Sequence, residues 1–141
     1  LRGMEAARIK ASYAIIAQKF GIEWKGRRFD RSNPDQTDVP NMAINHAVTA
    51  VEAAVTVAIY ATGTIPQLGF IHEDAAKSWV LDVCDLYRTT VTVPLAFRSA
   101  KEFSKQHDRT LDRIVRLYCS SHFKATGFID SVIDDIKDVL K

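Results

Sequence analysis

Residues 40–62 read PNMAINHAVTAVEAAVTVAIYAT, and Glu52 is the only charged side chain between Ile44 and Tyr60. A helix of this composition is apolar on nearly all sides, and such a helix usually runs through the centre of a domain. The segment therefore predicts a buried central helix that closes at Thr62-Gly63. Because Glu52 and several threonines interrupt the apolar run, we do not expect the segment to span a membrane.

Amphipathic patterns lie on both sides of this central segment. Over residues 3–20, apolar side chains recur every three or four positions from Ile9 to Phe20, and Gly21 ends the pattern. Residues 24–38 are loop-like. We expect one all-α domain over residues 1–141 with about six helices. The further helices are predicted at 78–88, 94–105, 109–123 and 127–140. Ser78, Asp108 and Thr126 are the predicted N-caps, and Pro94 opens the fourth helix. Residues 89–93 are β-branched and locally strand-like, but the patch is too short to outweigh its helical neighbours.

The bulk composition is that of a soluble globular domain. The chain has 141 residues, of which 47% are hydrophobic and 26% charged, so it is long enough to bury a core. The net charge of +2 is too small to indicate a nucleic-acid-binding protein by itself. Residues 1–30 hold seven Lys/Arg against three acids, which fits phosphate binding or simply a solvated helix face. Cys84 and Cys119 have neither zinc-site nor disulfide-framework spacing, so we expect buried reduced thiols in a cytoplasmic protein.

Four residues stand out as candidates for chemistry. Projecting the apolar stripe of residues 3–20 back by four positions places Glu5 on an inward helix face. His72 follows a glycine-containing turn, and Asp82 and Asp85 share a helix face because they are three residues apart. Carboxylates and an imidazole that converge suit Mg²⁺ or Mn²⁺. The spacing is not a motif by itself, since only the fold could bring these side chains together.

Each of these residues also has an ordinary structural explanation. The two aspartates are as well explained by a solvated helix face, and an isolated loop histidine usually has no ligand. Glu5 could pair with Arg2 or Arg8 on its own helix. From the residues alone, the prediction stops at an all-α domain with a possible carboxylate–histidine metal site.

Two longer stretches resemble a known family. Residues 2–30, RGMEAARIKASYAIIAQKFGIEWKGRRFD, and residues 66–88, PQLGFIHEDAAKSWVLDVCDLYR, are similar to the two signatures of the CRISPR-associated adaptation integrase, the Cas-one family, and most of all to its type I-E branch. The second signature usually reads P-x-x-G-F-x-H and then S-F-x-x-D-x-x-D. TVPLAF at 92–97 continues the similarity, and residues 98–141 fit a helical tail.

The resemblance implies specific residue roles. Glu5, His72 and Asp85 would bind the divalent metal, Mg²⁺ or Mn²⁺, and Asp82 would be an accessory acid of the catalytic site. Arg88, like Arg2, would lie near the DNA backbone. The implied reaction is metal-dependent endonuclease and integrase chemistry in spacer acquisition, in which 3′-hydroxyl ends of spacer DNA are joined to repeat DNA by transesterification.

The resemblance also implies partners and missing parts. The family has an N-terminal β-sheet domain that builds a homodimer, and it acts with the small Cas-two protein on DNA, without a membrane. We interpret this chain as the C-terminal helical catalytic domain, a fragment that would be inactive if it needed the absent domain. Glu52 stands where the family often has a tyrosine, so it could add negative charge near the metal or point elsewhere.

Two other functions remain open on the sequence alone. The chain could be a non-catalytic helical DNA-binding module, or it could be a structural dimerisation domain that binds neither metal nor DNA. In the first case the phosphates would be held by basic residues near the N-terminus, namely Arg2, Arg8, Lys25, Arg27 and Arg28.

Overall fold

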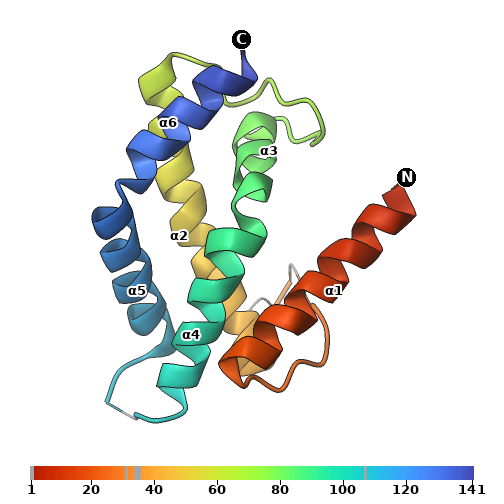
Figure 1. Ribbon diagram of the computed structural model, residues 1–141, viewed down its shortest axis with the longest axis vertical. Helices are drawn as coiled ribbons and strands as arrows, with labels where there is room; N and C mark the ends of the chain where they lie inside the picture. The colour runs from red at the N-terminus through yellow and green to blue at the C-terminus, as the bar shows by residue number, and fades with distance from the viewer. Residues whose placement is uncertain (1, 31, 34–35, 107) are drawn as a thin grey trace.

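The computed structural model describes residues 2–30, 32–33, 36–106 and 108–141, with side chains in the first helix described from residue 7 onward. All regular secondary structure in this part of the chain is helical, as the sequence predicts. The helices assemble into a bundle around a central helix (Figure 1). They are α1 (Arg2–Phe20), α2 (Val39–Thr62), α3 (Ser78–Leu86), the π-helical turn η1 (Arg88–Thr92), α4 (Val93–Phe103), α5 (Leu111–Thr126) and α6 (Phe128–Val139).

The helix α2 is the centre of the bundle, which confirms the prediction made from its composition. The carboxylate of Asp38 accepts a hydrogen bond from the Asn41 backbone N–H at 3.0 Å and so caps its first turn. Gly63 ends it with φ of 71°, a left-handed conformation that glycine adopts without strain. Residues along α2 pack against α3, α4, α5, α6 and η1, and their apolar side chains form the core.

The length and hydropathy of α2 would be sufficient to cross a membrane, although we expected Glu52 and the threonines to exclude this. Its position explains the composition differently. The helix α2 contacts four other helices of the bundle, and side chains such as Ala43, Val55 and Ile59 are completely buried. The apolar composition therefore corresponds to the core helix of a bundle.

The segment from α3 to α4 is almost continuously helical, so the β-branched patch at residues 89–93, too short to form a strand against its helical neighbours, is part of the helical run. The backbone N–H groups of Val91 and Thr92 both donate to the Tyr87 carbonyl, at 2.9 and 3.0 Å, and the second of these closes a π-helical turn. Tertiary packing overrides the weak local preference, because Val91, Thr92 and Val93 are buried. Pro94 lies in the first turn of α4, where the missing N–H costs nothing.

Three predicted N-caps are wrong. Lys77 occupies the cap position of α3, while the Ser78 hydroxyl exchanges hydrogen bonds with the backbone of Asp74 instead. The helix α5 begins after Thr110 rather than Asp108, and α6 begins after Gly127, because α5 continues through Thr126.

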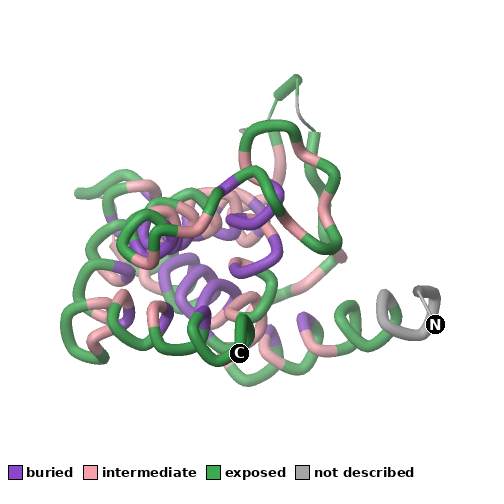
Figure 2. Tube along the Cα trace, turned by 90° about the horizontal axis from the view of Figure 1, so that it is seen from above, coloured by how far each residue is buried: buried purple, intermediate pink, exposed green. Residues whose placement is uncertain are grey.

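Among its described side chains, the first helix packs on the bundle through those of its C-terminal half. Tyr13 and Ala17 are buried, whereas Ile9 is 39% exposed. Figure 2 shows α1 leaving the bundle toward its N-terminal end, with mostly exposed residues along it. The predicted apolar stripe therefore does not continue inward as far as Ile9. The side chains of Arg2 and Glu5 lie outside the described residues, so their predicted roles stay predictions.

Candidate metal centre and adjoining cationic pocket

The carboxylate of Asp82 organises the turn that carries His72. It accepts backbone N–H groups from Phe70 at 2.5 Å, Ile71 at 3.0 Å and His72 at 3.0 Å. Gly69 makes the close approach possible, since a Cβ there would lie 2.6 Å from the Ser78 carbonyl carbon and 2.8 Å from Asp82 Oδ2. The turn is thus fastened to α3 by one buried carboxylate.

The same carboxylate orients the His72 ring. Asp82 Oδ1 lies 2.6 Å from His72 Nδ1, and the Asp82 side chain is only 5% exposed. Burial raises the pKa of Asp82, but hydrogen bonds from the His72 ring and the three backbone amides outweigh burial and bring the pKa below its ordinary value. An ionised Asp82 favours the proton on Nδ1 and leaves the Nε2 lone pair available.

His72 Nε2 faces the second aspartate of the pair. It lies 3.6 Å from Asp85 Oδ2, and the Asp85 side chain is 39% exposed. The other oxygen, Oδ1, accepts from Arg88 Nε at 2.9 Å and from Arg88 Nη2. His72, Asp82, Asp85 and Arg88 therefore converge at the turn and the α3–η1 junction, whereas the sequence could only place the two aspartates on one helix face.

The His72–Asp85 pair has the donor set and spacing that a divalent ion requires. Two adjacent ligand atoms bound about 2.1 Å from one ion lie roughly 3.0–3.5 Å apart for angles of about 90–110°. The observed 3.6 Å is close to this range. An imidazole whose far nitrogen is held by a buried carboxylate is the usual arrangement of a metal-ligating histidine. The two side chains fit a metal as a pair.

A third protein ligand does not lie near this pair among the residues whose side chains the structure describes. No group of three or more His, Cys, Asp or Glu side chains there could hold a metal. The accessory acid Asp82 supports His72 from behind, where its oxygens already accept four hydrogen bonds. Water, substrate oxygens or Glu5 would have to complete the coordination shell.

Glu52 forms an ion pair at the edge of this region. Its Oε1 lies 2.5 Å from Lys77 Nζ, and the two side chains are 25% and 43% exposed. Glu52 also helps to raise the pKa of Cys84 to about 12, after the larger effect of burial. The charge of Glu52 is therefore matched by Lys77, and the half-buried Cys84 thiol is protonated at neutral pH in this structure.

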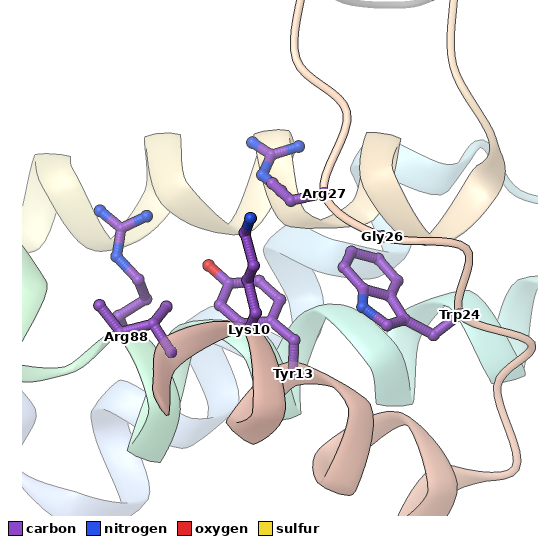
Figure 3. A pocket seen from close by; sticks show the side chains of 7 residues that line it. Lys10, Tyr13, Trp24, Gly26, Arg27 and Arg88 are labelled. Atoms are coloured by element: carbon purple, nitrogen blue, oxygen red, sulfur yellow. The ribbon is translucent and has the colours of Figure 1, made fainter. Parts of the chain in front are cut away.

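Arg88, which pairs with Asp85, also lines a cavity of about 610 Å³ (Figure 3). Three cationic side chains and two aromatic rings from separate parts of the chain line it. Tyr13 and Trp24 are stacked, with ring centroids 5.6 Å apart, and Trp24 also contacts Phe97 edge-on. Its lining residues are Ile9, Lys10, Tyr13, Trp24, Gly26, Arg27 and Arg88.

Arg27 carries a charge that no described carboxylate pairs with. Its guanidinium donates to the side-chain oxygens of Asn41 and Asn45 and to the Arg28 carbonyl, all of them neutral. Burial and, to a smaller extent, the charge of Arg88 lower the pKa of Arg27, whereas Tyr13 and the more distant carboxylate of Asp38 raise it without reversing the shift. Arg88, in contrast, is paired with Asp85. The pocket is therefore positive and suited to an anion.

No pattern in the sequence predicts this pocket as a unit. The sequence indicates Arg27 only as one of the basic residues of a DNA-binding module. Because the wall combines α1, the loop after it and the η1 turn, no local pattern connects these residues. The basic loop with Trp24 and Phe29 among its charges was the available indication.

The comparisons with known proteins agree on one family. The sequence matches the family model described as "CRISPR associated protein Cas1" over residues 1–118. It is 35% identical over 143 residues to the "CRISPR-associated endonuclease Cas1 1" of Rhodospirillum rubrum, covering 100% of this chain and 46% of that protein. It is 34% identical to the "CRISPR-associated endonuclease Cas1" of Escherichia coli K12, covering 99% of this chain and 45% of that protein.

Solved structures show the same similarity in three dimensions. The fold superimposes with a TM-score of 0.90 and 29% identity on a "TtCas1-DNA complex", covering 99% of this chain and 52% of that one. A second structure, titled "TtCas1", gives a TM-score of 0.79 and 27% identity. The chain spans about half the length of the relatives it matches. On the family match and the shared fold, this chain belongs to the Cas1 family of CRISPR-associated proteins.

Proposed function

We propose that this chain is the helical catalytic part of a metal-dependent enzyme that cuts and joins DNA strands during spacer acquisition. The observation that supports this most is the His72–Asp85 pair, 3.6 Å apart, beside a pocket whose cations include Arg27, which forms no ion pair with a described carboxylate. A metal-binding pair beside a phosphate-binding pocket suits phosphodiester chemistry.

The protein's own residues would bind and orient the reactants. His72 Nε2 and an oxygen of Asp85 would hold Mg²⁺ or Mn²⁺, with Glu5 as a further ligand. When bound, the ion supplies the charge that lowers the pKa of an attacking hydroxyl and polarises the phosphate. Asp82 keeps the His72 ring in place, and Arg88 restrains the Asp85 oxygen that faces away from His72. Positioning and charge stabilisation account for most of the rate in such reactions.

DNA would lie along the cationic pocket, with phosphates near Arg27 and Arg88 and with Arg2 contributing from α1. The related structure with a TM-score of 0.90 is described as a protein–DNA complex, which supports DNA as the substrate class. Attack by a DNA 3′-hydroxyl would form the new phosphodiester and release a strand end of the repeat. Attack by water at the same phosphate would give endonuclease activity.

The whole-protein context is part of the same proposal. We place the protein in the type I-E branch, because the two signature stretches resemble that branch most. The complete enzyme would be a cytoplasmic homodimer with an N-terminal β-domain, and it would work with the small Cas-two protein. In that setting residues 1–141 form a single helical domain that supplies the metal ligands.

Titration with Mn²⁺ at neutral pH tests the metal pair. We expect saturable binding by the parent chain and at least about a tenfold loss in Asp85→Ala, since a direct ligand should matter no less than an outer partner. Asp134→Ala is the matched control, because Asp134 is an exposed acid on α6 that contacts Lys137. Equal binding by the parent and Asp85→Ala would overturn the proposed site.

A non-catalytic DNA-binding module is the second candidate, and the uncompensated charge of Arg27 favours it. This alternative predicts DNA binding with a steep salt dependence and no requirement for a divalent ion. Strand cleavage that needs Mn²⁺ and is lost in His72→Ala of the full-length protein would exclude it. Binding that is insensitive to both changes would favour it over the enzyme.

A further inference from the structure

Arg27 is held in place by two asparagine side chains from α2. Its Nη1 donates to Asn41 Oδ1 at 3.0 Å, and its Nη2 donates to Asn45 Oδ1 at 2.6 Å. The asparagines are one helical turn apart, so their oxygens face the two terminal nitrogens of the guanidinium together. The second Nη1 hydrogen bond goes to the Arg28 carbonyl at 2.9 Å.

Asn41 is the fixed base of this arrangement. It is fully buried, and its side chain makes all four hydrogen bonds that an amide can make. The oxygen accepts from Arg27 and from the Arg28 backbone N–H, and the NH₂ group donates to the Gly26 carbonyl and to Asp38. Asn41 therefore fixes the loop that carries Arg27 as well as the guanidinium itself.

The remaining donors of Arg27 lie on one edge of its guanidinium. Three of its five N–H groups are used by Asn41, Asn45 and the Arg28 carbonyl. Nε–H and the second Nη2 hydrogen have no acceptor among the described residues. This side edge is one of the two that bind a phosphate through two parallel hydrogen bonds. Because Arg27 lines the pocket, we expect a phosphate that enters it to reach this donor pair.

The neutrality of the asparagines is the feature that distinguishes this support from an ordinary ion pair. Asp85 holds Arg88 equally well but matches its charge. Asparagine oxygens hold Arg27 without matching it, so the positive charge stays available to a ligand. A carboxylate at position 45 would keep the guanidinium oriented and cancel the charge.

We propose that Asn45, supported by Asn41, is a positioning residue that presents Arg27 to a backbone phosphate of the DNA strand with its full positive charge. The inference rests on the proposed function for the identity of the anion. We therefore expect substitution of Asn45 to change the affinity for phosphate more than it changes the stability of the fold.

The test measures affinity for a short fluorescent single-stranded oligonucleotide as a function of salt. The slope of log K against log [salt] becomes shallower by about 0.7 for each phosphate of a single strand that the protein no longer neutralises. Arg27→Ala should make the slope shallower by that amount. Asn45→Asp should make it shallower by the same amount, although Arg27 is retained. Asn45→Ala should keep the slope and weaken binding about 2- to 10-fold, the effect of removing one hydrogen bond.

Two comparisons separate a local effect from a general one. Ser120→Asp adds the same charge at an exposed position of α5 and should leave the slope unchanged. The double variant Arg27→Ala/Asn45→Asp should have the slope of Arg27→Ala, because both changes act on the same phosphate. Thermal unfolding of each variant shows whether the fold is intact. Asn45→Ala separates loss of support from loss of charge.

The inference would be overturned if the salt dependence of DNA binding by Asn45→Asp were as steep as that of the parent, or as steep as that of Ser120→Asp. If Mn²⁺ binds as proposed while the slope is unchanged, the inference fails and the proposed function stands. If the slope changes as expected while Asp85→Ala binds Mn²⁺ like the parent, the phosphate contact stands and the metal site fails. Absence of DNA binding by the parent would overturn both.

Discussion

The turn before α3 and the pocket lined by Arg27 meet at Arg88 but differ in whether their charged side chains are neutralised by the protein. In the turn before α3, the Asp82 carboxylate is matched by three backbone amides and the His72 ring. In the pocket beside it, the Arg27 guanidinium is held by neutral amide oxygens. A charge that is matched inside the protein builds structure, whereas an oriented but unmatched charge is available to a ligand. The comparison separates the support of the site from the groups that would contact DNA.

The same difference separates the two aspartates of α3. Asp82 is 5% exposed and faces the turn, while Asp85 is 39% exposed and faces His72 Nε2. They are three residues apart on one helix, yet only the second is accessible to a ligand. Variants that affect one region and not the other test this division.

The largest expected effect is that of Gly69→Ala, which acts on the turn. The new Cβ would lie within 2.8 Å of Ser78 and Asp82 atoms, so the turn must move away from α3. We expect a loss of about 2–3 kcal/mol in unfolding free energy, as for other overpacked sites, together with weaker Mn²⁺ binding. Urea unfolding and Mn²⁺ titration measure both quantities.

Leu68→Ala is the control for the glycine variant, because Leu68 is 67% exposed beside the same turn. It should change the unfolding free energy by less than about 0.5 kcal/mol. The salt dependence of DNA binding should be unchanged in Gly69→Ala, since Arg27 is held from α2. A parent-like stability for Gly69→Ala would show that the turn does not depend on this close approach.

Asp82→Asn should have the next largest effect. An amide in place of the carboxylate would direct N–H groups at backbone N–H groups, which costs about 1–3 kcal/mol for a buried unsatisfied donor. Removing the support of His72 should also weaken Mn²⁺ binding about 10- to 100-fold. Asp134→Asn, on the exposed face of α6, is the matched control. Unchanged affinity would show that Asp82 does not orient the ring.

The stability of the parent should depend on Asp82 at acid pH. Because the pKa of this group is lowered on folding, its stabilisation is complete above the unfolded pKa of about 3.9. It is lost as the pH falls through the still lower folded pKa. Urea unfolding below pH 4 should therefore show a steeper loss in the parent than in Asp82→Asn. Parallel pH profiles would contradict the lowered pKa.

Lys77→Ala should have a small effect, because its ion pair with Glu52 is partly exposed. We expect a loss of no more than about 1 kcal/mol in unfolding free energy. Mn²⁺ affinity should stay within about twofold of the parent if Glu52 takes no part in the metal site. A clear increase in affinity would mean that the released Glu52 carboxylate reaches the metal.

The smallest expected effect concerns the thiols. Burial is the main reason that the pKa of Cys84 is raised to about 12 and that of Cys119 to about 11. Alkylation by iodoacetamide at pH 8 should therefore be slow in the folded chain and fast in denaturant. Since a raised thiol pKa stabilises the fold below the unfolded value, stability should decline as the pH rises from about 8.5 toward the folded pKa values. Rapid labelling of the folded chain would contradict both values.

The sequence predicted the elements of the fold better than the connections between them. The apolar run of α2 specified a central helix, and all predicted helices are present. Residues 89–93 show the limit, because β-branched side chains favour strands locally but are buried here in a π-helical turn. The wrong N-caps at Asp108 and Thr126 reflect helix ends that are set by packing rather than by a capping residue.

For the site, the sequence identified the residue types but not which aspartate supports His72 and which one is accessible to a ligand. The motifs placed His72, Asp82 and Asp85 together, and the structure brings all three into one region. Which aspartate is buried depends on the turn folding over α3, and no pattern shows that. The pocket around Arg27 and Trp24 could not be predicted either, because the segments that line it are far apart in the sequence.

Spin-echo electron paramagnetic resonance of bound Mn²⁺, with the histidines labelled with ¹⁵N, shows directly whether His72 binds the metal. We expect a coupling from one directly bound histidine nitrogen in the parent chain. That coupling should disappear in His72→Gln and persist in His46→Gln, which alters a histidine on α2 that lines a surface pocket with Asp112 and Arg116 of α5. A parent without any ¹⁵N coupling, or a coupling that survives in His72→Gln, would contradict the assignment of His72 and Asp85 as the metal-binding pair.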